Sequence, residues 1–236
     1  MLEGYYKEKE KRREQGLPAL PLNAEQVQAI ADLFESGEGS EELLLLLENE
    51  VPPGVDEAAY VKAAFLKDLA LENISTDLIS PQKAIAMLGT MLGGYSVEAL
   101  VSVLKTNKFG AEVASALKYT ILVYDSFNDI FDLQEENKYA KEIINSWANA
   151  DWFLNKPKVE TEIALTIYKV GGETNTDDFS PAKEAWSRPD IPLHAQAFLK
   201  WSENISDPLD KLTDLKTDGS KLAFVGDVVG LSLIHI

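Results

Sequence analysis

The sequence predicts a mainly α-helical protein whose C-terminal part begins an α/β domain. Up to about residue 155, apolar side chains recur at helical spacing between short turns rich in Gly, Pro and Asn. From residue 160 to residue 170, apolar and other side chains alternate instead, as in a strand with one buried face. The change occurs around Asn155-Lys156-Pro157, so we place a domain boundary near residue 156.

The composition is that of a folded protein, and the net charge limits the classes of partner that it can bind. The 236 residues are 45% apolar, which is enough to fill the core of one large domain or two ordinary ones. The net charge of −17 repels nucleic acid and acidic membranes over most of the surface. The basic stretch from Lys7 to Arg13 is diluted by glutamates and is typical of a solvated helix face.

The sequence also limits cofactors and location. It contains no cysteine, which excludes disulfides and any zinc site or iron–sulfur cluster held by thiolates of these residues. No apolar run approaches the ~20 residues that span a bilayer, and the N-terminus is charged rather than apolar. We therefore expect a cytoplasmic protein without a membrane anchor.

Polar residues mark where the helices of the first domain should begin. A side-chain oxygen at such a position accepts a hydrogen bond from a backbone N–H of the first turn. The expected caps are Asn23 with Gln26 as a capping box, Ser40, Asp56, Ser80 before Pro81, and Ser96.

The bodies of these helices carry one apolar face each. Leu43 to Leu47 should form a helix that is buried on most sides, Pro52-Pro53-Gly54 should break the chain, and Gly93-Gly94 should close a helix that opens at Ser80-Pro81. Two longer helices are expected at about residues 111–127 and 139–153. About seven helices in all suggest stacked antiparallel helix pairs, although the repeat period is too irregular to define from the sequence.

Beyond residue 156 the pattern is that of strands and loops. Ile163, Leu165 and Ile167 should form the buried face of the first strand. A short helix is expected at residues 192–201, then a polar segment at 202–220, a second strand at 222–225 and a turn at 226–230. Residues 231–236 offer neither a helix start nor a partner strand. We interpret these residues as a non-native tail and exclude them, with His235, from the fold.

The segment from Gly171 to Ala195 holds the highest density of turn formers and polar side chains in the chain. One interpretation is a capped helix start around residues 177–181, since Asn, Asp and Ser bond their own backbone and Pro181 can open a helix. The other is a binding loop. Composition alone leaves both open.

Several blocks of this sequence resemble the bacterial aconitate hydratase B family. They occur in the family's order and are spread over most of the chain up to Gly230, as the N-terminal part of that enzyme. The blocks are VPPGVDEAAYVKA at 51–63, LGTMLGGY at 88–95, GETNTDD at 172–178, WSRPDIPLHA at 186–195 and VGDVVG at 225–230.

The resemblance implies a fold and an activity. It implies a HEAT-like α-helical domain at residues 1–155 and the incomplete start of an α/β swivel domain at 156–230. The family interconverts citrate and isocitrate through cis-aconitate in the tricarboxylic acid cycle, using a 4Fe-4S cluster. Many members also act in the 2-methylisocitrate series.

One site residue carries over from the resemblance. Arg188, in the WSRPDIPLHA block, corresponds to the family's arginine that binds a substrate carboxylate, and a guanidinium fork suits bidentate pairing with such a group. The alternative is an ion pair with one of the 39 acidic residues. Thr176, Asp177 and Asp178 align with a loop that shapes the same cleft, but structural capping explains them as well. We expect His194 to be a packed or capping residue rather than a general base.

The chain also departs from the family. After Val225 to Gly230 the family continues with TGSSR, which holds substrate and supplies the catalytic serine, whereas this chain has Leu231 to Ile236. The cluster-ligating cysteines are also missing, so we expect no catalysis by these residues alone. A second hypothesis is that the helical domain is an interaction module for dimerisation, a metabolic partner or RNA. A third is an unrelated acidic helical scaffold.

Overall fold

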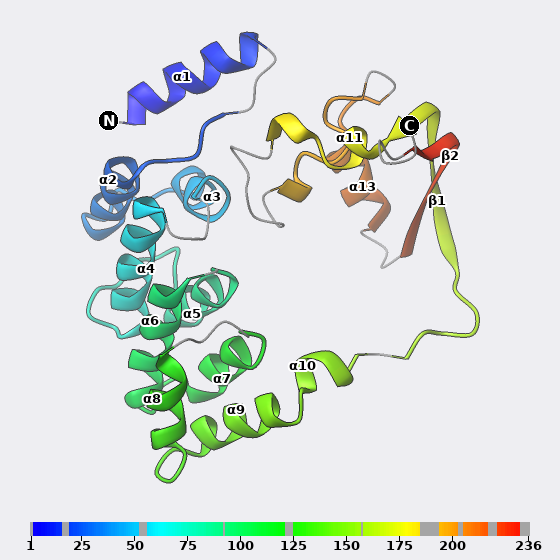
Figure 1. Ribbon diagram of the computed structural model, residues 1–236. Helices are drawn as coiled ribbons and strands as arrows, with labels where there is room; N and C mark the ends of the chain where they lie inside the picture. Colours follow the sequence, from blue (N-terminus) through cyan, green and yellow to red (C-terminus); the bar gives the residue numbers. More distant parts are fainter. Residues whose placement is uncertain are drawn as a thin grey trace. The chain divides into compact units, whose positions relative to one another are not determined.

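The computed structural model describes residues 2–15, 19–51, 56–91, 93–120, 125–156, 158–184, 194–202, 205–216 and 221–231. The chain divides into two compact units, one of residues 1–10 with 20–157 and one of residues 11–19 with 158–236. The first unit is helical, and the second holds a pair of strands with short helices (Figure 1). The prediction of a mainly α-helical protein is therefore confirmed.

More helices form in the first unit than the sequence indicated, and they are shorter. The helices are α1 (Leu2–Glu14), α2 (Ala24–Glu35), α3 (Glu41–Asn49), α4 (Glu57–Ala70), α5 (Pro81–Thr90), α6 (Gly94–Lys105), α7 (Gly110–Lys118), α8 (Ser126–Leu133), α9 (Lys138–Ala148) and α10 (Asp151–Leu154). The break expected at Pro52-Pro53-Gly54 lies outside the described residues.

A single apolar core runs through this unit. Helix α2 packs on α4, α4 on α5 and α6, and α5 on α7, while α9 packs on α7 and α8. Each contact buries large aliphatic side chains, among them Ile30 of α2, Leu66 of α4, Leu88 of α5, Leu104 of α6 and Leu117 of α7. The leucine run of α3 is buried as expected, apart from Leu45. Burial of the apolar faces, rather than helix propensity, holds these short helices in place.

Most of the predicted caps are confirmed. Asn23 and Gln26 form a reciprocal capping box at α2, and the Ser40, Asp56 and Ser80 side chains accept N–H bonds from the first turns of α3, α4 and α5. The prediction for Ser96 is wrong, because α6 already begins at Gly94. The Ser96 hydroxyl instead donates 2.8 Å to the carbonyl of Gly93. Gly93 and Gly94 therefore open α6 and do not close α5, which ends at Thr90.

The two long helices expected at 111–127 and 139–153 are each interrupted. Helix α7 ends at Lys118, and α8 begins at Ser126. Helix α9 ends at Ala148, and Ala150 adopts φ of 52°, a left-handed conformation that breaks the helical path before α10. Apolar residues continue at helical spacing across both interruptions, so the periodicity of the sequence does not predict either break.

Asn137 joins the start of α9 to the end of α6 and the turn that follows it. Its carboxamide oxygen accepts the N–H groups of Tyr139 and Ala140 at the start of α9. Its amide nitrogen donates 3.0 Å to the Leu104 carbonyl at the end of α6 and 2.8 Å to the side chain of Asn107. The side chain is buried; it pairs two N–H groups at the start of α9 and shares the Leu104 carbonyl with the N–H of Asn107.

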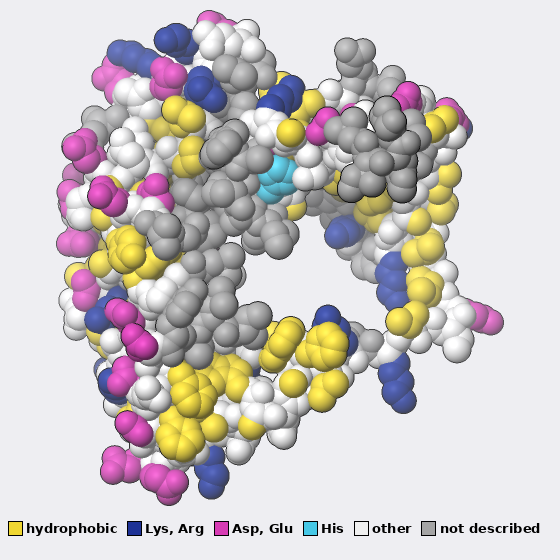
Figure 2. Space-filling model, in the orientation of Figure 1, with side chains coloured by type: hydrophobic (Ala, Val, Ile, Leu, Met, Phe, Trp, Pro, Cys, Tyr) yellow, Lys and Arg dark blue, Asp and Glu magenta, His cyan; other side chains and the backbone are white. Residues whose placement is uncertain are grey.

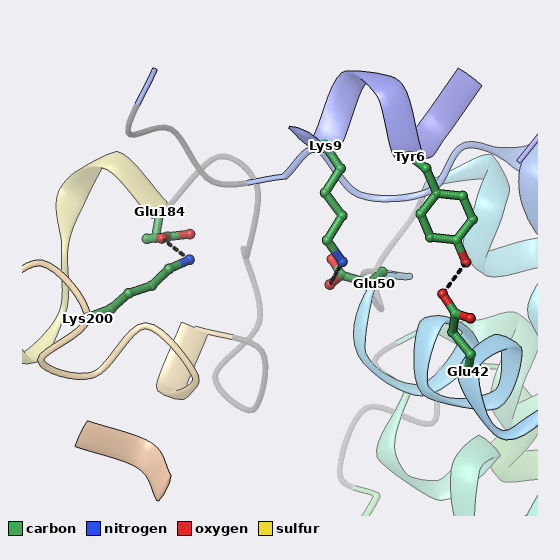
Figure 3. A network of polar contacts seen from close by, with 6 residues as sticks. All are labelled: Tyr6, Lys9, Glu42, Glu50, Glu184 and Lys200. Atoms are coloured by element: carbon green, nitrogen blue, oxygen red, sulfur yellow. Dashed lines mark hydrogen bonds and ion pairs between the residues drawn. The ribbon is translucent and has the colours of Figure 1, made fainter. Parts of the chain in front are cut away.

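Helix α1 attaches to the same unit through polar contacts (Figure 3). The Tyr6 hydroxyl donates 2.8 Å to Glu42 of α3, and Lys9 lies 3.8 Å from Glu50. Burial, together with this hydrogen bond and the charge of Glu42, raises the pKa of Tyr6 to about 12. Tyr6 therefore stays a hydrogen-bond donor throughout the neutral pH range.

Two parallel strands pair in the second unit, β1 (Leu165–Asn175) and β2 (Lys221–Leu231). The described helical segments between them are α11 (Thr176–Phe179), the short 3-10 helix η1 (Ala182–Glu184) and α13 (Pro208–Lys216). Both strands end later than predicted, and β1 also begins later, at Leu165 and not at residue 160. Strand β1 continues past Val170 through a β-bulge at Gly171-Gly172, and β2 continues through residues 226–230, where we had expected a turn. The expected tail lies outside the described residues, except that Leu231 ends β2.

The predicted inner face of β1 is wrong. Thr166, Tyr168 and Val170 point to the covered side, whereas Leu165 and Ile167 are exposed. The reason is an aromatic cluster on the Tyr168 side. Phe224 of β2 lies opposite Tyr168, and Phe179 and Phe198 pack on Phe224 with ring centroids 6.4 and 4.9 Å away. Alternation showed that the strand has two faces, but the face that is covered depends on residues far along the chain.

Replacing Asn137 by Ala should destabilise the helical unit by about 2–4 kcal/mol. The change removes the cap that pairs two N–H groups of α9, and it leaves the N–H of Asn107 as the partner of the Leu104 carbonyl. Thermal unfolding followed by circular dichroism measures the loss. The exposed Asn128 of α8, changed to Ala, is the matched control and should have almost no effect. Equal melting temperatures for the two variants would contradict the role of Asn137.

Candidate functional site

The polar segment from Gly171 to Ala195 divides into three parts. Residues 171–175 complete β1, and residues 176–184 form α11 and η1. Residues 185–193, which include Arg188, lie outside the described residues. The candidate site is therefore built from the two flanking segments, residues 175–184 and 194–201. The short helix expected at 192–201 is present as a helical turn at His194-Ala195 followed by turns.

A capping box fixes the turn from β1 into α11. The Asn175 side chain accepts the N–H groups of Asp177 and Asp178 at 2.8 and 3.3 Å. The Asp178 carboxylate accepts the N–H of Asn175 in return, at 2.9 Å. The cap is Asn175, so the helix starts earlier than the sequence suggested and does not use Pro181. Asp178 is occupied by capping, while Thr176 and Asp177 remain exposed.

A hydrogen bond connects the two flanking segments at Ser180. The Ser180 hydroxyl lies 2.9 Å from Nε2 of His194. The backbone adds a second connection, because the N–H of Leu199 donates 2.7 Å to the carbonyl of Asp178. Phe179 also stacks on Phe198, with ring centroids 5.2 Å apart, so the two segments share an aromatic contact as well.

Glu184 makes the strongest polar contact between these segments. Its side chain is fully buried, and Oε1 accepts a hydrogen bond from Nζ of Lys200 at 3.1 Å (Figure 3). The same oxygen accepts a second hydrogen bond from Nε1 of Trp201 at 3.0 Å. The ammonium group of Lys183 lies 3.2 Å above the Trp201 ring. A carboxylate without exposure to water requires such partners, so Glu184 holds Lys200 and Trp201 where they are.

These contacts hold both ends of the stretch 185–193 in place. Glu184, just before the stretch, is bonded to residues after it, and His194, just after the stretch, is bonded to Ser180 before it. The described residues on either side of the segment that carries Arg188 are therefore bonded to each other. No local pattern predicts a role for Glu184, because a glutamate beside Lys183 and Ala185 has the composition of an exposed turn.

In the carboxyl-terminal half of β1, Asp227 of β2 contacts the β-bulge at Gly171-Gly172. Its carboxylate accepts the N–H of Gly172 at 3.2 Å and lies 3.8 Å from Nζ of Lys169. Gly172 has φ of 75°, a backbone conformation that residues with a side chain rarely adopt. Residues 226–230, predicted as a turn, are thus part of a strand, and the Asp227 carboxylate is bonded to the neighbouring strand.

Metal ligands do not gather in the part of the chain that the structure describes. No group of three or more His, Asp or Glu side chains is placed there to hold an ion. The complete sequence has no cysteine, so its residues do not fit an iron–sulfur cluster. Among the described helices, none is long and apolar enough to cross a membrane.

Two family models match the chain, one in each part. The model described as Aconitate B N-terminal domain matches residues 4–153, and the model described as Aconitate hydratase 2 N-terminus matches residues 165–232. The first of these alone covers more than half of the sequence.

Curated relatives agree with these matches. Aconitate hydratase B of Synechocystis sp. is 47% identical over 234 residues, which is 98% of this chain and 27% of the relative. The proteins of the same name from Salmonella typhimurium and Escherichia coli are 47% and 46% identical over 241 residues. The chain thus spans about a quarter of the length of the relatives that it matches, at their N-terminal end.

Replacing Glu184 by Ala should release the segments that flank residues 185–193. Without the carboxylate, Lys200 and Trp201 lose their shared acceptor, so trypsin should cleave after Lys183 and Lys200 about tenfold faster. Mass spectrometry of timed digests measures these rates. Glu184→Gln keeps an acceptor oxygen and should stay close to the parent, as should Glu173→Ala on an exposed side chain. If trypsin cleaves Glu184→Ala no faster than the parent, the Glu184 contact does not restrain the flanking segments.

Proposed function

Since the chain belongs to the aconitate hydratase B family, we propose that it is the N-terminal part of a cytoplasmic hydro-lyase of the tricarboxylic acid cycle. The complete enzyme interconverts citrate and isocitrate through cis-aconitate, and its substrates include the 2-methylisocitrate series. The observation that carries this proposal is the 46–47% identity to aconitate hydratase B proteins over 98% of the chain.

We propose that the two units correspond to the two domains that the family resemblance implies. Residues 1–155 form a HEAT-like helical domain, and residues 156–230 form the start of the swivel domain. The stacking of α2, α4, α5 and α7 on successive neighbours supports the first assignment. The parallel pairing of β1 with β2 supports the second, because a parallel pair with helical segments between its strands is the opening unit of an α/β fold.

Arg188 is the substrate-binding residue in this proposal. A tricarboxylate needs a permanently charged partner that can donate two parallel hydrogen bonds, and only arginine offers a planar fork of that kind. The contacts of Glu184 and His194 support the assignment, since they fix both ends of the segment that carries Arg188. Preorganised ends reduce the entropy lost when substrate is bound.

The neighbouring polar residues then have supporting roles. Asp178 caps α11, and the exposed Thr176 and Asp177 border the same turn, where they can shape a cleft without holding substrate. His194 positions its segment through Ser180. A role as general base would need Nε2 to be available for a substrate proton, whereas it already lies at hydrogen-bond distance from the serine.

The cluster chemistry must come from residues outside this sequence. A 4Fe-4S cluster is held by cysteine thiolates, and none of the 236 residues is a cysteine. The iron of the cluster supplies the Lewis acid that polarises the substrate hydroxyl. These residues therefore contribute substrate binding and not the chemical step.

A second candidate function is that of an interaction module. Exposed aromatic residues favour it, because Phe127 stacks on Phe131 and Trp147 in α8 and α9, and Phe153 of α10 is also exposed. Hydrophobic side chains gather on the surface over α8 to α10 in Figure 2. Such patches mark contacts with a second copy or a metabolic partner. RNA fits less well, since the charge is −17. Sedimentation of residues 1–155 alone tests for self-association of this unit.

Replacing Arg188 by Ala should lower kcat/KM of the complete enzyme for isocitrate about 100-fold, through the loss of a bidentate charged contact. Arg188→Lys keeps the charge without the fork and should recover only part of the loss. Formation of cis-aconitate, followed by its ultraviolet absorbance, is the measurement. Arg13→Ala on α1 is the control. Full activity of Arg188→Ala would refute the assignment of Arg188 but not the family.

The 236 residues alone should not form cis-aconitate from citrate or isocitrate. They lack cluster thiolates and the family's TGSSR segment. Incubation of the purified chain with iron, sulfide and either substrate tests this expectation. Absorbance that appears and is abolished by a chelator would show that these residues assemble a catalytic centre after all.

A further inference from the structure

A β-bulge interrupts the pairing of β1 with β2 just before the candidate site. The register shifts between Val170 and Glu173, so that Gly171 and Gly172 of β1 both lie opposite Asp227 of β2. Such a bulge leaves an extra residue without a partner in the ladder of backbone hydrogen bonds. The left-handed φ of Gly172, 75°, is accessible at low strain because glycine has no side chain.

The Asp227 side chain supplies the acceptor that the backbone ladder lacks at this point. Its Oδ2 accepts the N–H of Gly172 at 3.2 Å, and its Oδ1 lies 3.8 Å from Nζ of Lys169. The Lys169 and Asp227 side chains are 70% and 62% exposed, so water screens their ion pair and the pair contributes little. The hydrogen bond from Gly172, in contrast, joins a fixed backbone donor to a charged acceptor. This hydrogen bond therefore closes the bulge.

The bulge lies immediately before the turn that leads into the candidate site. Only two residues separate Gly172 from Asn175, whose capping box starts α11. One of the two, Thr174, is buried, so this short connection is packed in place and is not free to adjust. Thr176 and Asp177 follow at the carboxyl end of β1, and in open α/β sheets ligands bind outside the carboxyl ends of the strands. The position of this turn thus depends on the bulge.

We propose that Asp227 is a positioning residue for substrate binding. By holding the N–H of Gly172 it fixes the carboxyl end of β1, and with it the turn that carries Thr176 and Asp177 at the border of the cleft. Asp227 acts through this turn and does not itself contact substrate, because its carboxylate is bonded to the neighbouring strand. The inference rests on the proposed function, since the cleft and its tricarboxylate belong to that proposal.

Loss of the Asp227 carboxylate should weaken substrate binding and leave the chemical step almost unchanged. In the complete enzyme, Asp227→Ala should raise KM for isocitrate about tenfold with kcat within about twofold of the parent, because the turn must then become ordered as substrate binds. Asp227→Asn keeps a carbonyl oxygen for the N–H of Gly172 and should recover most of the loss. Lys169→Ala removes the ion pair but not this hydrogen bond, and should behave like the parent. The ultraviolet absorbance of cis-aconitate gives both constants.

The two glycines of the bulge provide a second, matched test. Among the described residues, a β-carbon at Gly171 would meet nothing within 4 Å, so Gly171→Ala should leave KM unchanged. Gly172→Ala strains the left-handed residue that donates to Asp227 and should raise KM in the same direction as Asp227→Ala. Circular dichroism gives the melting temperature of each variant and shows whether the fold is retained. A purely structural defect would lower the amount of active enzyme, and so the measured kcat, with KM unchanged.

An unchanged KM in Asp227→Ala would overturn the proposal, as would a lower kcat at constant KM, or an Asp227→Asn variant no better than Asp227→Ala. The failure of this inference is distinguishable from that of the proposed function. If the parent forms cis-aconitate and Arg188→Ala impairs it while Asp227→Ala leaves KM unchanged, only the role of Asp227 is wrong. If the parent enzyme forms no cis-aconitate, the proposed function fails and the role of Asp227 fails with it.

Discussion

The parallel pairing of β1 with β2 is the constraint on which the second unit depends. Parallel strands cannot be joined by a hairpin, so residues 176–220 must cross from the end of one strand to the start of the other. The crossover brings Phe179 and Phe198 onto one side of the sheet, against Tyr168 and Phe224. Asn175, Ser180, Glu184 and His194 belong to this crossover, so the candidate site exists only while the strands are paired.

The helical unit could be predicted wherever its signals were local. Asn23, Ser40, Asp56 and Ser80 cap helices as expected, because a cap acts on the backbone two or three residues away. Ser96 misled the prediction because the same hydroxyl can donate to the preceding turn. The interruptions after α7 and α9 were missed because apolar periodicity continues across them.

In the second unit, the covered face of the sheet and the partners of the buried residues could not be predicted from the sequence. Alternation in β1 revealed two faces, yet Ile163, Leu165 and Ile167 were assigned to the core, although the aromatic cluster covers the opposite side. Glu184 gave no signal, since its burial arises from Lys200 and Trp201 on the far side of residues 185–193. Arg188 came from resemblance alone. The roles of these residues depend on contacts between segments that are distant in the sequence, and a local sequence pattern does not predict such contacts.

Asn137 has a consequence for how the helical unit opens. A stack of helix pairs normally frays from its end, because the last pair contacts only its neighbour. Here the start of α9 is bonded through one carboxamide to the end of α6, so the last helices cannot detach without exposing backbone groups of an interior helix. Slow amide hydrogen exchange should therefore reach almost to the end of the stack, and α6 and α9 should exchange as a single cooperative block.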